Sequence, residues 1–388
     1  MPEPDGPPPL WPFPATQEIT EVLEWRTDVL QSRAGEQRIA LRSHPREIVT
    51  LQHRCDALGM ARAAELVRAG LAGEWLVPLW HMAVQPTADI AQGATEIAVD
   101  TTVADFRVGE AVAIAVDGRE ASLVEIVSVG ADRLNLAEPL GALLPAANLA
   151  PQRFSIAPVR AASLSATVEI VRRRQNDGMV TATFVLRDAP NFTTPAMPSY
   201  LGRPVQTDPS LTRSPITVSL RRSVEYVDNG FGPVVLEPLR DQFERGETIT
   251  LKAQGAIKRW ALRRWLWSLR GRQTSFWLPT WGRELQLRAA MTSGSTLMRA
   301  APIADIAGYA GRAILLEMPS GLRFRTITAA VTESADHRLT LSSNLGDPVA
   351  INTRVHFLTL VRSDADRIEI RHGAVASEVT LPVVEVSE

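Results

Sequence analysis

The sequence predicts a mainly β protein with short α-helices, an α+β fold made of two similar modules. Three observations lead to this prediction. Short segments recur in the same order at an offset of about 200 residues, apolar residues alternate at period two, and turn dipeptides separate the alternating stretches. Each module is expected to contain a strand-helix-strand part followed by a small β-barrel or sandwich.

The repeat is clearest in the strand-helix-strand parts. Glu-Ile-Val-Thr-Leu at 47–51 recurs as Glu-Thr-Ile-Thr-Leu at 247–251. Trp-Leu-Val-Pro-Leu-Trp at 75–80 matches Phe-Trp-Leu-Pro-Thr-Trp at 276–281. Matches that keep their order at nearly constant spacing indicate a duplication.

The repeat and two Pro-rich stretches divide the chain into six segments. We predict an N-terminal arm at 1–19, a strand-helix part at 20–85, a β part at 86–189, a linker at 190–225, and a second strand-helix part and β part at 226–282 and 283–388. Because proline fixes φ and lacks an N–H, the linker is expected to be an extended, semi-rigid spacer.

A helix is predicted after the first strand of each module. In the first module the apolar stripe consists of Ala57, Met60, Ala61, Ala64 and Val67. In the second module it consists of Ala261, Leu262, Trp265, Leu266 and Leu269, interleaved with arginines. Both stripes have the spacing of an amphipathic helix.

The β parts are predicted from strict alternation. In the first module Ile97 and Val99 alternate with polar or small residues, as do three residues at 112–116 and two at 134–136. Asp117-Gly118 lies where a hairpin turn is needed, and Ser320-Gly321 is its counterpart in the second module.

Composition excludes several classes of protein. The 388 residues include 41 basic and 43 acidic side chains, so no overall charge would collect nucleic acid or an anionic membrane. No run of roughly 18 apolar residues could span a bilayer, and the N-terminus lacks the pattern of a secretory signal. The one cysteine, Cys55, excludes an internal disulfide framework, so we expect folding in a reducing compartment.

A search for catalytic motifs finds none. There is no phosphate-binding loop, no G-x-S-x-G elbow and no H-E-x-x-H pair, and the histidines follow no metal-binding spacing. We therefore assign no catalytic, cofactor-binding or metal-ligating residue, and we predict that the protein is not an enzyme.

Tryptophan and arginine gather in the second helix, and this composition is typical of interface anchors. Three tryptophans within eight residues cannot all point in one direction on a helix. We predict that the anchors are Arg259, Trp260, Arg263, Arg264, Trp265 and Trp267 in this helix, and Trp11 and Phe13 in the arm. The arm needs a surface to lie on, either its own module or a neighbouring subunit.

Several short motifs resemble those of distal-tail and tail-tip proteins of long-tailed bacteriophages. The opening of these proteins resembles the segment that contains Thr-Asp-Val at 27–29, Gly-Glu-Gln-Arg at 35–38 and Pro-Arg at 45–46, which leads into a strand. Tyr-Val-Asp-Asn-Gly at 226–230 and the ending Asp-Arg-Ile-Glu-Ile at 366–370 are similar to segments of the same family. The resemblance is spread over most of the chain, and none of its motifs is a catalytic signature.

The resemblance implies a structural protein of the virion tail, assembled in the cytoplasm of a bacterial host. Its partners would be further copies of itself, the tail tube protein, and hub, spike or fibre proteins. Three two-module chains would present six similar modules to a six-fold tube, so we expect a homotrimer with pseudo-six-fold symmetry, with a homohexamer as the alternative. The other class of function is a virion protein that binds glycans or a receptor through exposed tryptophans.

Overall fold

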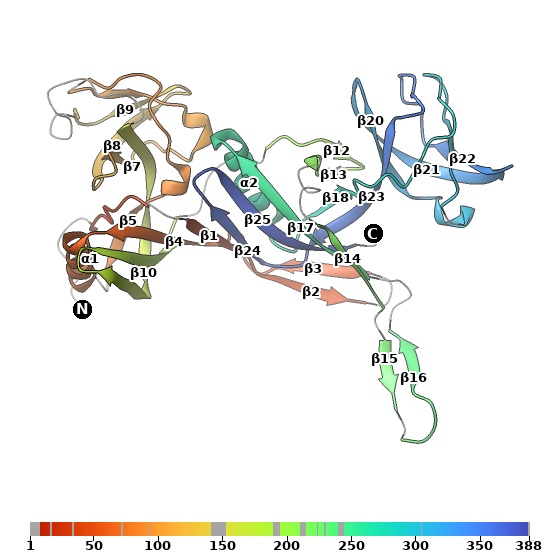
Figure 1. The fold of residues 1–388 in the computed structure, drawn as a ribbon, viewed down its shortest axis with the longest axis horizontal. Coiled ribbons are helices and arrows are strands. Elements are labelled where there is room, and N and C mark those ends of the chain that lie inside the picture. Colours follow the sequence, from red (N-terminus) through yellow and green to blue (C-terminus); the bar gives the residue numbers. More distant parts are fainter. Residues whose placement is uncertain are drawn as a thin grey trace.

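The computed structural model describes residues 8–15, 18–32, 35–70, 73–91, 93–140, 153–188, 195–209, 215–222, 224–228, 230–239, 244–303 and 305–386. The remaining parts of the predicted arm and linker lie outside these residues. The molecule is elongated, with a first half (residues 8–188) and a second half (residues 195–386) side by side along its length (Figure 1).

The first half contains β1 (Ile19–Glu24), β2 (Thr27–Gln31), β3 (Glu36–Ala40), β4 (Arg46–Cys55), α1 (Ala57–Gly70), β5 (Glu74–Pro78), η1 (Trp80–Met82), β6 (Glu96–Ala98), η2 (Thr101–Val103), β7 (Ala111–Val116), β8 (Ser122–Val129), β9 (Arg133–Leu136), β10 (Phe154–Arg174) and β11 (Asp177–Leu186). The predicted strand-helix-strand order and the alternating strands of the β part are confirmed here. Asp117 and Gly118 both have positive φ, 53° and 67°, as the central residues of the β-turn in which the N–H of Arg119 donates to the carbonyl of Val116 at 3.0 Å.

The second half contains β12 (Ser199–Tyr200), β13 (Arg203–Pro204), β14 (Thr217–Arg221), β15 (Val224–Val227), β16 (Val235–Pro238), β17 (Glu244–Gln254), α2 (Ala256–Leu269), β18 (Ser275–Pro279), β19 (Leu297–Ala300), η5 (Ile306–Gly308), β20 (Ala313–Met318), β21 (Gly321–Glu333), β22 (Asp336–Leu341), β23 (Arg354–Ser363), β24 (Arg367–His372) and β25 (Ala376–Glu385). The described residues therefore form a mainly β protein with two α-helices, as predicted. The predicted linker is more than a spacer, because β12 to β14 lie within it.

One antiparallel sheet passes through both halves. Its strands follow the spatial order β11, β4, β1, β24, β25, β17 and β14. β1 pairs with β4 of its own half on one edge and with β24 of the second half on the other, where Ile19 lies opposite His372 and Glu24 opposite Arg367. The sequence did not predict this pairing between halves.

Each half also carries an antiparallel β part, which lies above the shared sheet in Figure 1. In the first half the pairing order is β6, β9, β8, β7 and β10. In the second half it is β19, β22, β21, β20 and β23. The long strand β10 belongs both to its β part, through β7, and to the shared sheet, through β11.

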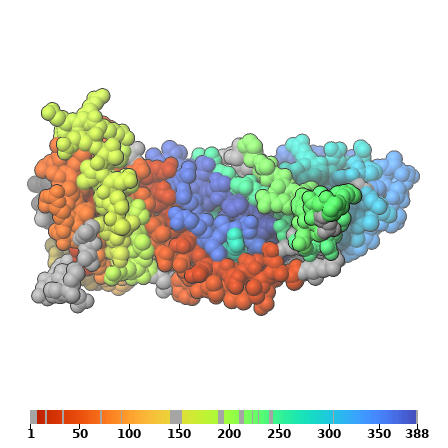
Figure 2. Space-filling model, turned by 90° about the horizontal axis from the view of Figure 1, so that it is seen from below, coloured from red at the N-terminus to blue at the C-terminus, as the bar shows by residue number. Residues whose placement is uncertain are grey.

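Besides the strand pairing, each half places side chains in the apolar core of the other half. Leu23 of β1 is completely buried and packs in the apolar core of the second half, while Trp260 of α2 packs in the core of the first half. The β2–β3 hairpin lies along the second half, where Glu36 accepts two hydrogen bonds from Arg362, at 2.7 and 3.0 Å. Figure 2 shows this hairpin in red-orange beside the blue strands. Together with the pairing of β1 and β24, these contacts form an extensive interface between the two halves, which we call the joint.

The arm lies on its own half. Leu10 forms a parallel bridge with Leu76 of β5, and the backbone N–H of Ala121 donates to the carbonyl of Pro12 at 2.8 Å. Trp11 is completely buried and Phe13 is 5% exposed. The prediction that these two side chains anchor a partner is therefore corrected: both are part of the core of the chain itself.

Candidate functional site: the ionic cluster between the halves

Charged side chains are buried where the two halves meet. Arg263 of α2 donates through Nε to Glu21 Oε1 at 2.7 Å and through Nη2 to Glu47 Oε2 at 2.9 Å. Glu21 belongs to β1 and Glu47 to β4, so an arginine of the second half holds two carboxylates of the first. All three side chains are less than 5% exposed.

The strand pattern explains why these carboxylates point inward. In β1, Ile19, Glu21 and Leu23 share one face because side chains alternate along a strand. Glu47 occupies the same face of β4 as the buried Val49. A glutamate on the buried, otherwise apolar face of an alternating strand is costly to bury unless a cation pairs with it. Arg263 supplies that cation.

Two histidines extend the cluster. His372 of β24 lies with Nε2 at 3.0 Å from Glu21 Oε2 and Nδ1 at 2.8 Å from Ser377 Oγ. His81 of η1 lies with Nε2 at 3.6 Å from the same carboxylate oxygen. The two imidazole rings stack with centroids 4.7 Å apart. Glu21 therefore uses one oxygen for Arg263 and turns the other to the histidines.

Burial and charge set the protonation states. Burial alone raises the pKa of Glu21, but Arg263 and the two histidines outweigh it and hold that pKa well below its usual range. Burial raises the pKa of Glu47 to about 7, since Arg263 offsets only part of this effect. Burial lowers the pKa of His81 to about 3, so this imidazole is neutral at neutral pH.

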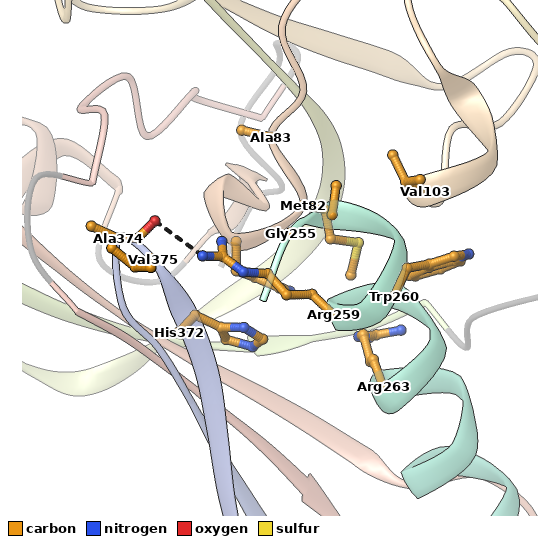
Figure 3. A pocket seen from close by; sticks show the side chains of 12 residues that line it. Met82, Ala83, Val103, Gly255, Arg259, Trp260, Arg263, His372, Ala374 and Val375 are labelled. Carbon is orange, nitrogen blue, oxygen red and sulfur yellow. Dashed lines mark hydrogen bonds between the residues drawn. The ribbon is translucent and has the colours of Figure 1, made fainter. Parts of the chain in front are cut away.

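A cavity of about 220 Å³ opens beside the cluster. Figure 3 shows that Met82 and Val103 of the first half face Arg259, Trp260 and His372 of the second half across it. Arg259 fixes the rim, because its Nη2 donates to the carbonyls of Gly373 and Ala374 at 3.2 and 3.0 Å. The cavity leads from the surface to both histidines, and it leaves room for a small ligand or water molecules next to them.

The predicted anchors of α2 lie mainly inside the molecule. Trp260, Arg263 and Trp265 are buried, whereas Arg259, Arg264 and Trp267 are partly buried. Trp265 packs edge-on against Phe276, and Arg264 lies over the ring of Trp260 at 5.6 Å. The prediction of exposed anchors in this helix is therefore corrected for the three buried side chains, which bind the halves to each other.

Sequence reasoning missed the histidine-carboxylate group because its members are far apart in the chain. Glu21, His81 and His372 come from three elements, and no local spacing relates them. The sequence did contain one indication of this group: Glu21 occupies a strand position at which the alternation calls for an apolar residue.

Another buried histidine, His53, fixes the arm and gives the fold a pH dependence. Trp11 Nε1 donates to His53 Nε2 at 2.8 Å, and His53 Nδ1 lies 2.9 Å from the carbonyl of Pro14. Burial lowers the pKa of His53 to about 4 from an ordinary value of 6.5. The neutral ring is the form that accepts from Trp11.

We expect the free energy of unfolding to fall as the pH drops from about 6.5 to 4, by roughly 3 kcal/mol from His53. The sign follows because the unfolded chain binds this proton at higher pH than the folded chain does. Urea unfolding at several pH values measures the slope. His53→Gln should reduce the slope in this window without abolishing it, because His81 also has a pKa lowered by burial, whereas His44→Gln, at an exposed histidine, should leave the slope unchanged. An equal slope in H53Q would contradict the assignment.

In the described part of the chain, no helix combines the length and apolar character needed to cross a membrane. No family model and no curated protein matches the chain.

Proposed function

We propose that the protein is a structural component of a phage tail tip or baseplate, a ring or hub protein that joins the tail tube to the distal hub, spike or fibres. The proposal combines the resemblance of its short motifs to tail-tip proteins with the way its strands are paired. The observation that carries it is the pairing of β1 with β24 between the halves, together with two strand edges that are left open in the described residues.

We further propose that the two halves are copies of one module. In the first half β4 pairs with β11 and β5 with β10, and in the second β17 pairs with β25 and β18 with β23. A strand-helix-strand unit precedes the β part in both. Even the flanking segments correspond, since Leu10 bridges Leu76 and Val205 bridges Trp277, both in parallel orientation. These shared pairings support the duplication that the sequence suggests.

In this scheme β14 corresponds to β1, because each pairs with the first long strand of its own half. The distal part of β10 corresponds to β24, because each pairs with the last long strand of its half. β1 and β24 meet inside the chain. Among the described residues, the outer edge of β14 and the edge of β10 beyond residue 163 have no strand partner. These edges belong to the two ends of the shared sheet.

The open edges carry apolar side chains. Val218 and Leu220 on β14 are exposed, and so are Ile170 and Val171 on β10. An unprotected strand edge is a template for pairing with another chain. We propose that β14 of one copy pairs with β10 of the next, in the geometry that β1 and β24 have within one copy.

Such a contact is heterologous, so repeating it closes a ring when the rotation between modules permits. Three copies would place six modules around the ring, alternating joints within and between chains. A homotrimer with pseudo-six-fold symmetry fits a six-fold tail tube on one side and a three-fold hub or spike on the other. A homohexamer is the alternative stoichiometry.

The β15–β16 hairpin offers a contact to other tail proteins. It projects from the body of the molecule in Figure 1, and its exposed apolar side chains are Tyr226, Phe231, Val234, Val235 and Leu236. Phe231 is 93% exposed. Exposed apolar residues on a projecting element mark an interaction site, and we assign this one to a hub, spike or fibre protein.

Cysteine cross-linking tests the joint between copies. In a Cys55→Ser background, Thr167→Cys and Thr217→Cys together should form disulfides between copies under mild oxidation, because these two positions are equivalent to Glu369 and Val22, which lie opposite each other where β24 pairs with β1. On denaturing gels without reductant, the largest cross-linked species should be the closed ring. In the favoured stoichiometry this species is a trimer. Each single cysteine variant serves as the control and should stay monomeric on the gel, because a heterologous contact does not bring a position against its own copy.

Charged substitutions give a second measurement. Leu220→Asp and Val171→Asp should each reduce the assembled mass in light scattering to that of the monomer, with little change in thermal midpoint. Val108→Asp, at an exposed site away from both edges, should assemble normally. A wild-type chain that stays monomeric at micromolar concentration would contradict the proposed ring.

The glycan-binding alternative requires exposed tryptophan rings. All nine tryptophans lie in the described part of the chain, and each is buried or partly buried. No observation therefore favours that function, and we do not carry it forward.

A further inference from the structure

We propose that Glu21, His81 and His372 bind one divalent transition-metal ion, with Zn²⁺ as the ion that the donor set fits best. The inference does not depend on the function proposed above, since it rests on the joint within one chain. The three donors are Glu21 Oε2, His81 Nε2 and His372 Nε2, and donor atoms of these residues lie within 4.8 Å of one another.

The distances to Glu21 suit a small metal ion. Its Oε2 lies 3.0 Å from His372 Nε2 and 3.6 Å from His81 Nε2. Ligand bonds of about 2.0–2.2 Å in a tetrahedral zinc site place neighbouring donors roughly 3.3 Å apart. Two imidazoles and one carboxylate form a borderline N₂O donor set, which favours zinc and related ions over calcium or magnesium.

His81 gives the strongest indication. Its side chain is 1% exposed, yet neither ring nitrogen makes a hydrogen bond within the described residues. A buried imidazole without partners loses the hydrogen bonds that it made to water. A metal ion on Nε2 would replace one of those interactions, and the neutral ring has the lone pair that coordination needs.

The surroundings orient the other two donors. Ser377 Oγ lies 2.8 Å from His372 Nδ1, which fixes that ring and leaves Nε2 for a ligand bond. Arg263 holds Glu21 Oε1 at 2.7 Å, so Oε2 can bind in monodentate fashion. Arg263 is also paired with Glu47, so its charge beside the site is compensated.

The site has an entry path and an open coordination position. The cavity of about 220 Å³ is lined by both histidines, so ions and water can reach the donors through it. Two of the donors belong to β1 and η1 in the first half, and the third belongs to β24 in the second. A bound ion would therefore link the halves and stabilise the joint.

Zinc binding by the full chain tests the proposal. The protein is stripped with EDTA, desalted, incubated with ZnCl₂ and desalted again before elemental analysis and thermal unfolding. We expect about one zinc per chain and a higher thermal midpoint with Zn²⁺, but no such shift with Mg²⁺. His81→Gln and His372→Gln should each weaken zinc binding at least about 100-fold and abolish the shift.

His337→Gln is the matched control, because His337 is also buried but lies in the β part of the second half. It should retain zinc and the shift. H81Q removes a side chain without hydrogen bonds, so it should fold even if H372Q does not. No zinc retained by the wild-type chain, or equal retention by H81Q, would overturn the proposal.

Discussion

Replacing Arg263 with methionine is expected to lower the free energy of unfolding by about 3–5 kcal/mol, because it leaves two buried carboxylates without their cation. Arg263 donates to Glu21 at 2.7 Å and to Glu47 at 2.9 Å, and all three side chains are buried. The methionine keeps much of the volume, so the loss comes from the uncompensated charge. The shift of the urea midpoint, measured after chelation of metal ions, checks the value.

Two further variants separate charge from packing. Arg264→Met changes the next residue of α2, which is only partly buried, and should have a much smaller effect. Combining Arg263→Met with Glu21→Gln and Glu47→Gln removes the charges together and should recover much of the stability. If R263M and R264M destabilise the chain equally, the cluster does not hold the joint.

Replacing Trp11 with alanine is expected to cost about 3–5 kcal/mol, the usual loss for a large aromatic side chain in a core. Trp11 is completely buried, with its ring 5.2 Å from that of Phe13 and 5.4 Å from that of Phe184. The change leaves a cavity and also removes the donor to His53. Thermal and urea unfolding of the full chain measure the loss.

The conservative variant divides the two contributions. Trp11→Phe keeps an aromatic ring but loses the indole N–H, so it should cost about 1–3 kcal/mol, the penalty of an unsatisfied buried acceptor. Phe231→Ala removes an aromatic ring that is 93% exposed and should leave stability nearly unchanged. A W11A chain as stable as wild type would mean that the arm does not belong to this core.

The elements of the fold follow closely from the sequence where the signal is local. Alternation predicts β7 and β9, and the helical stripes predict α1 and α2, because side-chain period depends on neighbouring residues alone. The turn at Asp117-Gly118 was predictable for the same reason, since it needs two residues that tolerate positive φ.

The use of the aromatic residues was not predictable in this way. A tryptophan beside arginine has the same composition in a subunit interface as in a joint within one chain. Trp260 and Trp265 fill the cores of the molecule itself, and Trp11 reaches its core through a Pro-rich segment that cannot fold alone. Only the tertiary arrangement distinguishes these cases.

The ionic cluster depends on pairings that no local pattern encodes. Arg263 and Glu21 come from different halves, and β1 finds β24 only when both halves are present. The alternation of the strands places Glu21 and Glu47 at positions expected to be buried and apolar. It does not indicate which cation or which histidines face them.

The pairing of β1 with β24 also governs when the chain can fold during synthesis. Glu21 and His372 are separated by 351 positions, so β1 gains its second neighbour only after the ribosome has added all of these residues. Loop closure over such a distance is slow, and an open strand exposed meanwhile invites aggregation. A nascent chain stalled before β24 would therefore expose one edge of β1 and depend on chaperones, and neither half is expected to express well as a separate fragment.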